Sequence, residues 1–297
     1  MTIRNPDARG ESRSRSEGGR PTAALGIGLQ GSSRYRTGMS TAPLQVFVDR
    51  LLLRSNLDKA EQAAILHLPW QRDRVAAGQE LAEFGERTDT TYLVETGAVG
   101  RYSQMHNGVR QIVAMHIVGE MADLCAVVLP KSSWSYQALI PSTVLRIAHV
   151  DLLSLCDRYP AVAKAFWQDC IVDMAIMSEW MVSLARRPAD SRLAHLTCEL
   201  ECRYAQADQI AADGSFSFPV TQAQLAEILG ITSVHVNRMV RSLREKGLAT
   251  ISKSAIAVHD RPALERLAEF SSDYLHLPAG WRGGGREAFT VAAVRPR

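Results

Sequence analysis

The sequence lacks a long apolar run. No stretch of about eighteen consecutive apolar residues occurs in its 297 residues, and the N-terminus has no apolar core of the signal-peptide type. We therefore expect a cytoplasmic protein with no membrane partner. Hydrophobic residues make up 46% of the chain, which is ample for the cores of two domains.

Cysteine is scarce. The five cysteines are an odd number, which argues against a disulfide framework in a chain of this length. No pair has zinc-finger spacing. Cys198 and Cys202 stand four residues apart on a predicted helix, and without a second pair nearby they are best interpreted as small core residues. We predict no metal site.

A strong excess of one charge is also missing. Lys and Arg number 34 against 31 Asp and Glu, a formal net charge of +3, so binding to nucleic acid would depend on local clustering. One cluster, from Arg238 to Lys253, holds five Lys or Arg and one acid. No converging set of catalytic groups is visible, since the acids are scattered and the predicted strands carry no His-x-His pair. We predict that the protein is not an enzyme.

The most informative segment runs from Val220 to Leu248 and reads VTQAQLAEILGITSVHVNRMVRSLREKGL. Thr221 and Gln224 have the spacing of a capping box at the start of a helix. Gly230 stands where the chain must turn in a left-handed conformation, and Thr232 can cap a second helix. This arrangement predicts a helix-turn-helix.

The second helix of this motif has two distinct faces. Val236, Met239, Val240 and Leu243 form an apolar side, and the opposite side is formed by Val234, Asn237, Arg238 and Arg241. Such a cationic face suits the major groove of double-stranded DNA. The following segments LATIS and AIAVH predict a two-stranded wing, with Lys253 at its tip either contacting phosphate or simply solvated.

Glycine-punctuated segments precede this region. Between Gly78 and Gly119 short apolar runs alternate with glycines, and Asn107-Gly108 is a hairpin signal. This spacing predicts a small antiparallel β-barrel or jelly roll, and hence an α+β protein.

A long helix is predicted from Pro160 to about Arg187. Its apolar residues advance in alternating steps of three and four, which favours a homodimer interface over an internal core stripe. The predicted seam consists of Trp167, Cys170, Met174, Met177, Met181 and Leu184.

These observations give five predicted regions. Residues 1–41 form a disordered basic tail, 42–160 the β-barrel domain and 161–187 the dimerisation helix. Residues 188–262 form the winged helix-turn-helix domain, and 263–297 a C-terminal helix with a disordered tail.

Together these features resemble the Crp/Fnr family of bacterial transcription regulators, from about Val46 to His276. The resemblance implies a cyclic-nucleotide-binding-like sensor domain that controls a homodimer, a two-fold-symmetric operator and contact with RNA polymerase. It assigns base reading to Ser233, Val234 and Arg238, with Arg238 matching a guanine-reading arginine. Val234 replaces a common glutamate, and the further candidates for base or phosphate contacts are His235, Asn237 and Arg241.

The resemblance also places an effector pocket. Family members that bind cyclic nucleotides have a Gly-Glu pair, present here as Gly119-Glu120, followed by an arginine that neutralises the phosphate. That arginine is missing, and the matching residues are Lys131, Ser132 and Ser133. We assign no cofactor and do not expect cyclic AMP to bind in the usual way.

Three alternatives stay open. A cyclic nucleotide could still bind, or haem could be held by His106, His116 or Cys125, whereas an iron–sulfur cluster is improbable because no cysteine precedes Cys125. The chain could also be a nucleotide-binding module whose winged domain binds a protein.

Overall fold

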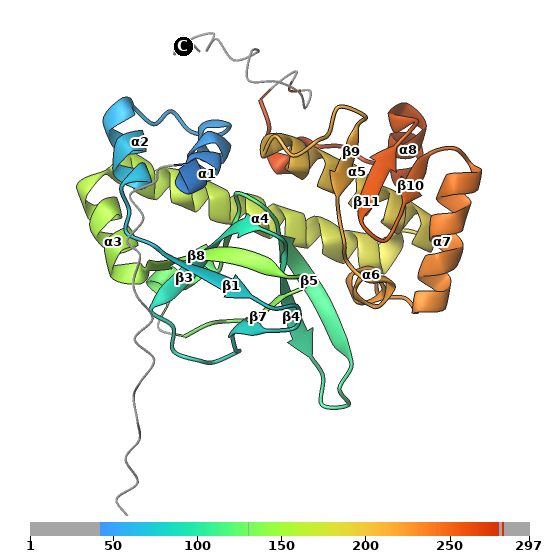
Figure 1. The fold of residues 1–297 in the computed structure, drawn as a ribbon, viewed down its shortest axis with the longest axis horizontal. Coiled ribbons are helices and arrows are strands. Elements are labelled where there is room, and N and C mark those ends of the chain that lie inside the picture. The colour runs from blue at the N-terminus through green and yellow to red at the C-terminus, as the bar shows by residue number, and fades with distance from the viewer. Residues whose placement is uncertain (1–41, 130, 279–280, 282–297) are drawn as a thin grey trace, which may run out of the picture. The chain divides into compact units, whose positions relative to one another are not determined.

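The structure, a computed structural model, describes residues 42–129, 131–278 and 281. The tail predicted for residues 1–41 and most of the tail predicted within 263–297 lie outside the described residues. The rest consists of a β-domain (residues 71–148) flanked by helices, the long helix α4, and a winged domain (residues 189–268) (Figure 1).

The β-domain is built from two four-stranded antiparallel sheets, as predicted for a jelly roll. The first contains, in spatial order, β1 (Gln71–Val75), β8 (Ser142–Ala148), β3 (Thr90–Thr96) and β6 (Met121–Ala122). The second contains β2 (Glu80–Ala82), β7 (Ser135–Ala138), β4 (Val99–Gln104) and β5 (Arg110–His116). Small and β-branched residues of both sheets, such as Val94, Val144 and Val99, form one buried cluster between them.

The predicted hairpin at Asn107-Gly108 connects β4 and β5. Its turn is longer than the two-residue type that the dipeptide suggests. The main-chain N of Met105 lies 2.8 Å from the O of Val109, and the N of Gly108 lies 2.9 Å from the O of Met105. Gly108 takes φ +82°, which a residue with a Cβ adopts only at a cost.

Three helices flank the β-domain. They are α1 (Ala42–Leu52), α2 (Lys59–Leu66) and α3 (His149–Arg158), and the short helix η1 (Leu124–Val128) follows β6. Phe47 of α1 and Ile65 of α2 pack with Leu93 and Leu145 of the first sheet and with Phe166 of α4. This second cluster holds the start of α4 against the β-domain.

Helix α4 (Pro160–Arg186) begins with proline at its first turn, where the missing N–H costs nothing. The helix ends at Arg186, next to the predicted end at about Arg187. Arg187 has extended backbone angles because Pro188 follows it, and α5 (Ala189–Gln206) then begins. Among the described residues no helix is both long and apolar enough to cross a bilayer.

The winged domain contains α5, α6 (Gln222–Leu229), α7 (Ser233–Glu245) and α8 (Arg261–Ala268), followed by η2 (Asp273–Leu275). The predicted wing is present as β10 (Ala249–Ile251) and β11 (Ala255–Val258), and β9 (Ser215–Ser217) adds a third strand beside β11.

One apolar cluster continues from the β-domain into the winged domain. Ile112 of β5 and Leu139 belong to the same buried cluster as Leu225, Ile228 and Val236 of the helix-turn-helix. The contact between the domains is therefore a packed core.

Candidate DNA-binding surface and effector pocket

Local hydrogen bonds form the helix-turn-helix as the sequence predicts. The Thr221 N–H donates to Gln224 Oε1 at 2.7 Å, and the Gln224 N–H donates to Thr221 Oγ1 at 3.2 Å. The helix α6 ends at Gly230, which is left-handed at φ +63°, and the N–H groups of Gly230 and Ile231 both donate to the O of Ala226. The capping box and the glycine turn are confirmed.

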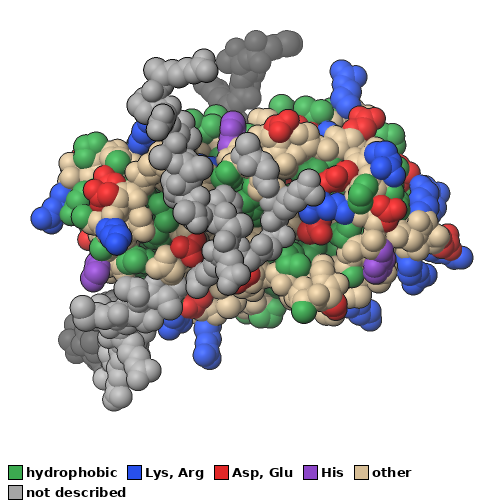
Figure 2. Space-filling model, turned by 90° about the horizontal axis from the view of Figure 1, so that it is seen from above, with side chains coloured by type: hydrophobic (Ala, Val, Ile, Leu, Met, Phe, Trp, Pro, Cys, Tyr) green, Lys and Arg blue, Asp and Glu red, His purple; other side chains and the backbone are tan. Residues whose placement is uncertain are grey.

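Helix α7 presents a polar face to solvent. Thr232 caps it by accepting a hydrogen bond from the His235 N–H at 3.3 Å, and Val236 and Leu243 are buried on its inner side. All the predicted DNA-contacting residues except the half-buried His235 are exposed: Ser233, Val234, Asn237, Arg238 and Arg241 on α7, and Lys253 in the wing. Figure 2 shows Lys and Arg side chains gathered at the end of the molecule that carries α7 in Figure 1.

Two cations on this face have partners within α7 itself. Arg238 Nη2 lies 2.9 Å from His235 Nε2, and Arg241 Nε donates to Glu245 Oε1 at 2.7 Å. These contacts are exposed and weak, so both guanidinium groups can exchange them for a base edge or a phosphate. Val234 is 80% exposed and has no polar group.

The glutamate of the predicted effector pocket is already engaged. Glu120 is buried, and its carboxylate accepts from Arg203 of α5 in two hydrogen bonds, 3.0 Å from Nε to Oε1 and 2.5 Å from Nη2 to Oε2. Arg50 Nε of α1 lies 3.8 Å away. Burial alone would raise the pKa of Glu120, but Arg203 and Arg50 lower it to about 2, so the group is an anion committed to these arginines.

A second arginine fills the interior of the β-domain. Arg101 of β4 is 2% exposed, and its Nη2 lies 2.6 Å from Asp173 Oδ2 of α4. Its Nε donates to the Tyr136 hydroxyl at 3.0 Å, and its guanidinium stacks over the Trp134 ring at 4.7 Å. The charge of Arg101 is thus already paired with an acid of α4 inside the protein.

The remaining predicted pocket residues do not converge on Glu120. Ser132 is buried, and its hydroxyl lies 2.7 Å from the O of Trp134 and 3.2 Å from Asp123 Oδ2. Lys131 is exposed and Ser133 half-buried. Gly119 has φ +80°, and a Cβ there would meet Val46 of α1. Helix α1 thus closes the side of the Gly119-Glu120 turn.

The three residues considered for haem lie in different surroundings. His106 lies exposed at the tip of the β4–β5 hairpin, whereas His116 is buried and Cys125 half-buried. Burial lowers the pKa of His116 to about 4. Within the described ranges no three His, Cys, Asp or Glu side chains are placed to share a metal ion.

The predicted seam divides between two faces of α4. Trp167, Met174 and Met181 are exposed, whereas Cys170, Met177 and Leu184 are half-buried. Met177 Sδ lies 3.9 Å from Arg101 Nη1, and Leu184 lines a small cavity in the hinge. The exposed stripe consists of Trp167, Ile171, Met174, Ser178, Met181, Val182 and Ala185.

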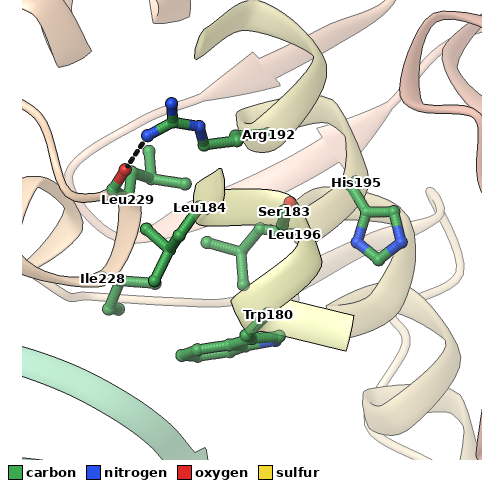
Figure 3. Close-up of a pocket in the computed structure, with 8 residues that line it drawn as sticks. All are labelled: Trp180, Ser183, Leu184, Arg192, His195, Leu196, Ile228 and Leu229. Carbon is green, nitrogen blue, oxygen red and sulfur yellow. Dashed lines mark hydrogen bonds between the residues drawn. The ribbon is translucent and has the colours of Figure 1, made fainter. Parts of the chain in front are cut away.

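The hinge between α4 and α5 contains little free space. Figure 3 shows its cavity, about 20 Å³, between Trp180 and Leu184 of α4, His195 of α5 and the end of α6. This volume suffices for about one water molecule and not for a nucleotide. Arg192 Nη1 donates to the O of Leu229 at 2.7 Å across it.

The charged residues that occupy the interior were not predicted from the sequence. Arg101 follows Val99 by two residues, so strand alternation alone places it on the same inward face. Asp169 and Asp173 interrupt the apolar spacing of the long helix one turn apart. The spacing in the sequence therefore could have indicated that an arginine of the strand and two acids of the long helix face inward. It could not indicate that Arg203 pairs with Glu120.

Known proteins share this organisation. Residues 72–159 match the cyclic nucleotide-binding domain family, and residues 191–267 match the Crp-like helix-turn-helix domain family. The chain is 21% identical to the fumarate and nitrate reduction regulatory protein of Shigella dysenteriae, over 74% of this chain and 88% of the relative. The protein of that name from Vibrio cholerae is 23% identical over 77% and 89%.

A solved structure shares the fold. FixK2 from Bradyrhizobium japonicum matches with a TM-score of 0.60 and 23% identity, over 67% of this chain and 96% of that one. Both domain matches, the relatives and the fold agree with the resemblance seen in the sequence. The chain belongs to the Crp/Fnr family and is a DNA-binding transcription regulator, not an enzyme.

Proposed function

We propose that the protein binds a two-fold-symmetric operator as a homodimer, with one α7 in each of two successive major grooves. The observation that carries this proposal is the exposed face of α7, where Arg238, Asn237 and Val234 stand free of the core. Two such helices about 34 Å apart would fit half-sites one helical turn apart.

Each side chain on this face has a distinct role in the proposal. Arg238 reads guanine through O6 and N7, and Val234 packs on a thymine methyl. Ser233, His235 and Asn237 add base or phosphate contacts. Arg241 and Lys253 neutralise phosphates, which position the protein without reading sequence.

A second copy of the chain would cover the exposed stripe on α4. Apart from Val182, its exposed members from Trp167 to Ala185 advance in steps of four and three, the spacing of a coiled-coil seam. Trp167 is 73% exposed and Met174 58% exposed, large apolar surfaces that a partner helix would remove from water. Contact with RNA polymerase is proposed from the family alone.

We further infer that DNA binding does not require a cyclic nucleotide. The carboxylate that would bind the ribose is held by Arg203, and the interior arginine is held by Asp173. A nucleotide that used Glu120 would have to break its buried pair with Arg203 without the family's phosphate-binding arginine, at a cost of several kcal/mol. The haem alternative lacks a comparable supporting observation.

A binding experiment tests the proposal. Full-length protein is used to select sequences from random double-stranded DNA, and affinities are then measured across salt. We expect a palindromic motif and a steep fall of log K with log salt, because bound phosphates release counterions. Arg238→Ala should abolish the preference for the motif and leave weak non-specific binding, whereas Arg244→Ala, the matched control, should weaken both about equally. A response without salt dependence would instead indicate a protein partner for the winged domain.

A further inference from the structure

Both ends of α6 are bonded to the β-domain. Like any helix, α6 ends with four carbonyl groups that have no partner within the helix. Here the Ala226 carbonyl accepts from the turn, and that of Leu229 accepts from Arg192. The two between them, of Glu227 and Ile228, receive the amide of Gln111 from β5.

The Gln111 contact is close and partly shielded from water. Its Nε2 lies 2.5 Å from the O of Glu227 and 3.2 Å from the O of Ile228. Arg110, the neighbour of Gln111 on β5, has its Nε 3.9 Å from Glu227 Oε2. That ion pair is partly exposed and contributes little, so the neutral amide makes the main polar contact.

At the start of α6 the hydrogen-bond donor is on the helix and the acceptor is in the β-domain. Gln224 uses Oε1 to accept the Thr221 N–H of the capping box, and its Nε2 donates to the main-chain O of Leu139 in the β-domain. We call the contacts of Gln111 with Glu227 and Ile228, and of Gln224 with Leu139, the clasp. The clasp lies at the edge of the apolar cluster shared by Ile112, Leu139, Leu225 and Ile228.

The clasp leaves the reading face of α7 free. Val234 and Arg238 remain exposed, because the clasp engages only α6. Helix α7 packs on α6 through Val236, so an α6 fixed at both ends also fixes the direction of α7 relative to the β-domain and α4. In the proposed dimer, that direction sets the distance and angle between the two reading helices.

We propose that the clasp is a spacing device: Gln111 and Gln224 determine which separation of half-sites the dimer accepts. This inference rests on the proposed function, since it presupposes a dimer on a two-fold-symmetric operator. One added base pair turns the second half-site by about 34°. A clasped dimer resists that rotation. Without the clasp, the apolar cluster and the Arg203–Glu120 pair still join the domains, but α6 has lost the polar contacts at its ends and can shift further as the chain bends at Arg187-Pro188.

The test uses full-length protein and the palindromic duplex selected by the wild type, together with versions whose central spacer is one base pair shorter or longer. Gln111→Ala removes the amide. Gln224→Glu removes the donor to Leu139 while keeping the capping box, because glutamate accepts the Thr221 N–H equally well. Gln104→Ala, in an exposed position of the same hairpin, is the matched control.

The wild type and Gln104→Ala should lose on the order of tenfold or more in affinity for each changed spacer, as for a poorly fitted site. The Gln111→Ala and Gln224→Glu proteins should bind the duplex with the best spacer more weakly than the wild type does. Their affinities for the three duplexes should differ by only about threefold, since changing the spacer then costs less binding free energy. Unchanged spacer preference in both folded, dimeric variants would overturn the inference and leave the proposed function intact. Failure of both to fold would also overturn it, by assigning the clasp to core stability. If the wild type selects no palindrome, the proposed function itself fails.

Discussion

Arg203 of the winged domain and Glu120 of the β-domain form a doubly hydrogen-bonded ion pair that is almost completely shielded from water. Arg203 also donates to Glu199 at 2.8 Å one turn earlier on α5. The Glu199 carboxylate in turn accepts from Trp180 of α4 and from Tyr274 at 2.9 Å. A single arginine thus links the turn after β5 to both long helices.

The first prediction concerns the stability of this pair. Arg203→Met leaves the Glu120 anion without its main partner and should lower the free energy of unfolding by about 3–5 kcal/mol. Arg72→Met removes an exposed pair with Glu95, in which Arg72 is 45% exposed, and should cost about 0–1 kcal/mol. Denaturant unfolding followed by fluorescence measures both. Equal losses for the two variants would contradict a special role for the buried pair.

The second prediction concerns acid sensitivity. Burial lowers the pKa of His116 to about 4, and burial with the nearby Arg187 does the same for His195. Between pH 6.5 and 4 the unfolded chain therefore binds protons that the folded chain does not, so stability falls as pH falls through this window. Between about pH 4 and 6 Asp123 opposes this loss, because burial raises its pKa to about 6.

Between pH 7 and pH 5 each histidine should lower the free energy of unfolding by about 2 kcal/mol, because one unit of pKa corresponds to about 1.36 kcal/mol. His116→Gln should remove its share of the difference, whatever its effect on stability at pH 7. His106→Gln, at the exposed hairpin tip, should leave the difference unchanged. Unfolding curves of the three proteins at both pH values give the result, and a variant at position 116 with the wild-type difference would refute the assignment.

The helix-turn-helix could be predicted from the sequence because its signals are local. Thr221, Gln224, Gly230 and Thr232 act on residues within a few positions of themselves, and all four take the predicted conformations or contacts. The strand pattern likewise predicted a small antiparallel barrel or jelly roll. The interior of the β-domain could not be predicted, since its partners are far apart in the sequence.

Arg101 shows this limit most clearly. Its partner Asp173 lies 72 residues away and on a different element, so only the folded arrangement brings them together. The seam shows a smaller version of the same limit. Helical periodicity indicated that Trp167, Met174 and Met181 lie on one side of α4. Which of the neighbouring residues are covered depends on how α4 packs against the β-domain.

The third prediction tests the exposed stripe of α4. Met174→Asp places a charge at the centre of the proposed interface, where desolvation would be costly, and should convert the dimer to a monomer. Its own fold should persist, because Met174 is 58% exposed. Light scattering gives the mass in solution. Val150→Asp is the matched control, an exposed apolar residue on α3, and should leave the mass unchanged. A dimeric Met174→Asp protein would argue against this interface.

The last prediction concerns sequence preference. Val234 is the second residue of α7, in the turn that approaches base edges in helix-turn-helix proteins. Valine can only pack on the thymine methyl group, whereas a glutamate there would accept a hydrogen bond from cytosine N4. Val234→Glu should therefore change the preferred base at one position of each half-site, by about 1–3 kcal/mol per position. Because the side chain is exposed and has no partner within the described chain that would be disturbed, the unfolding curve should stay the same. Selection from random duplexes with both proteins would show the change, and Val150→Glu controls for added charge. An identical motif for wild type and Val234→Glu would mean that Val234 does not face a base.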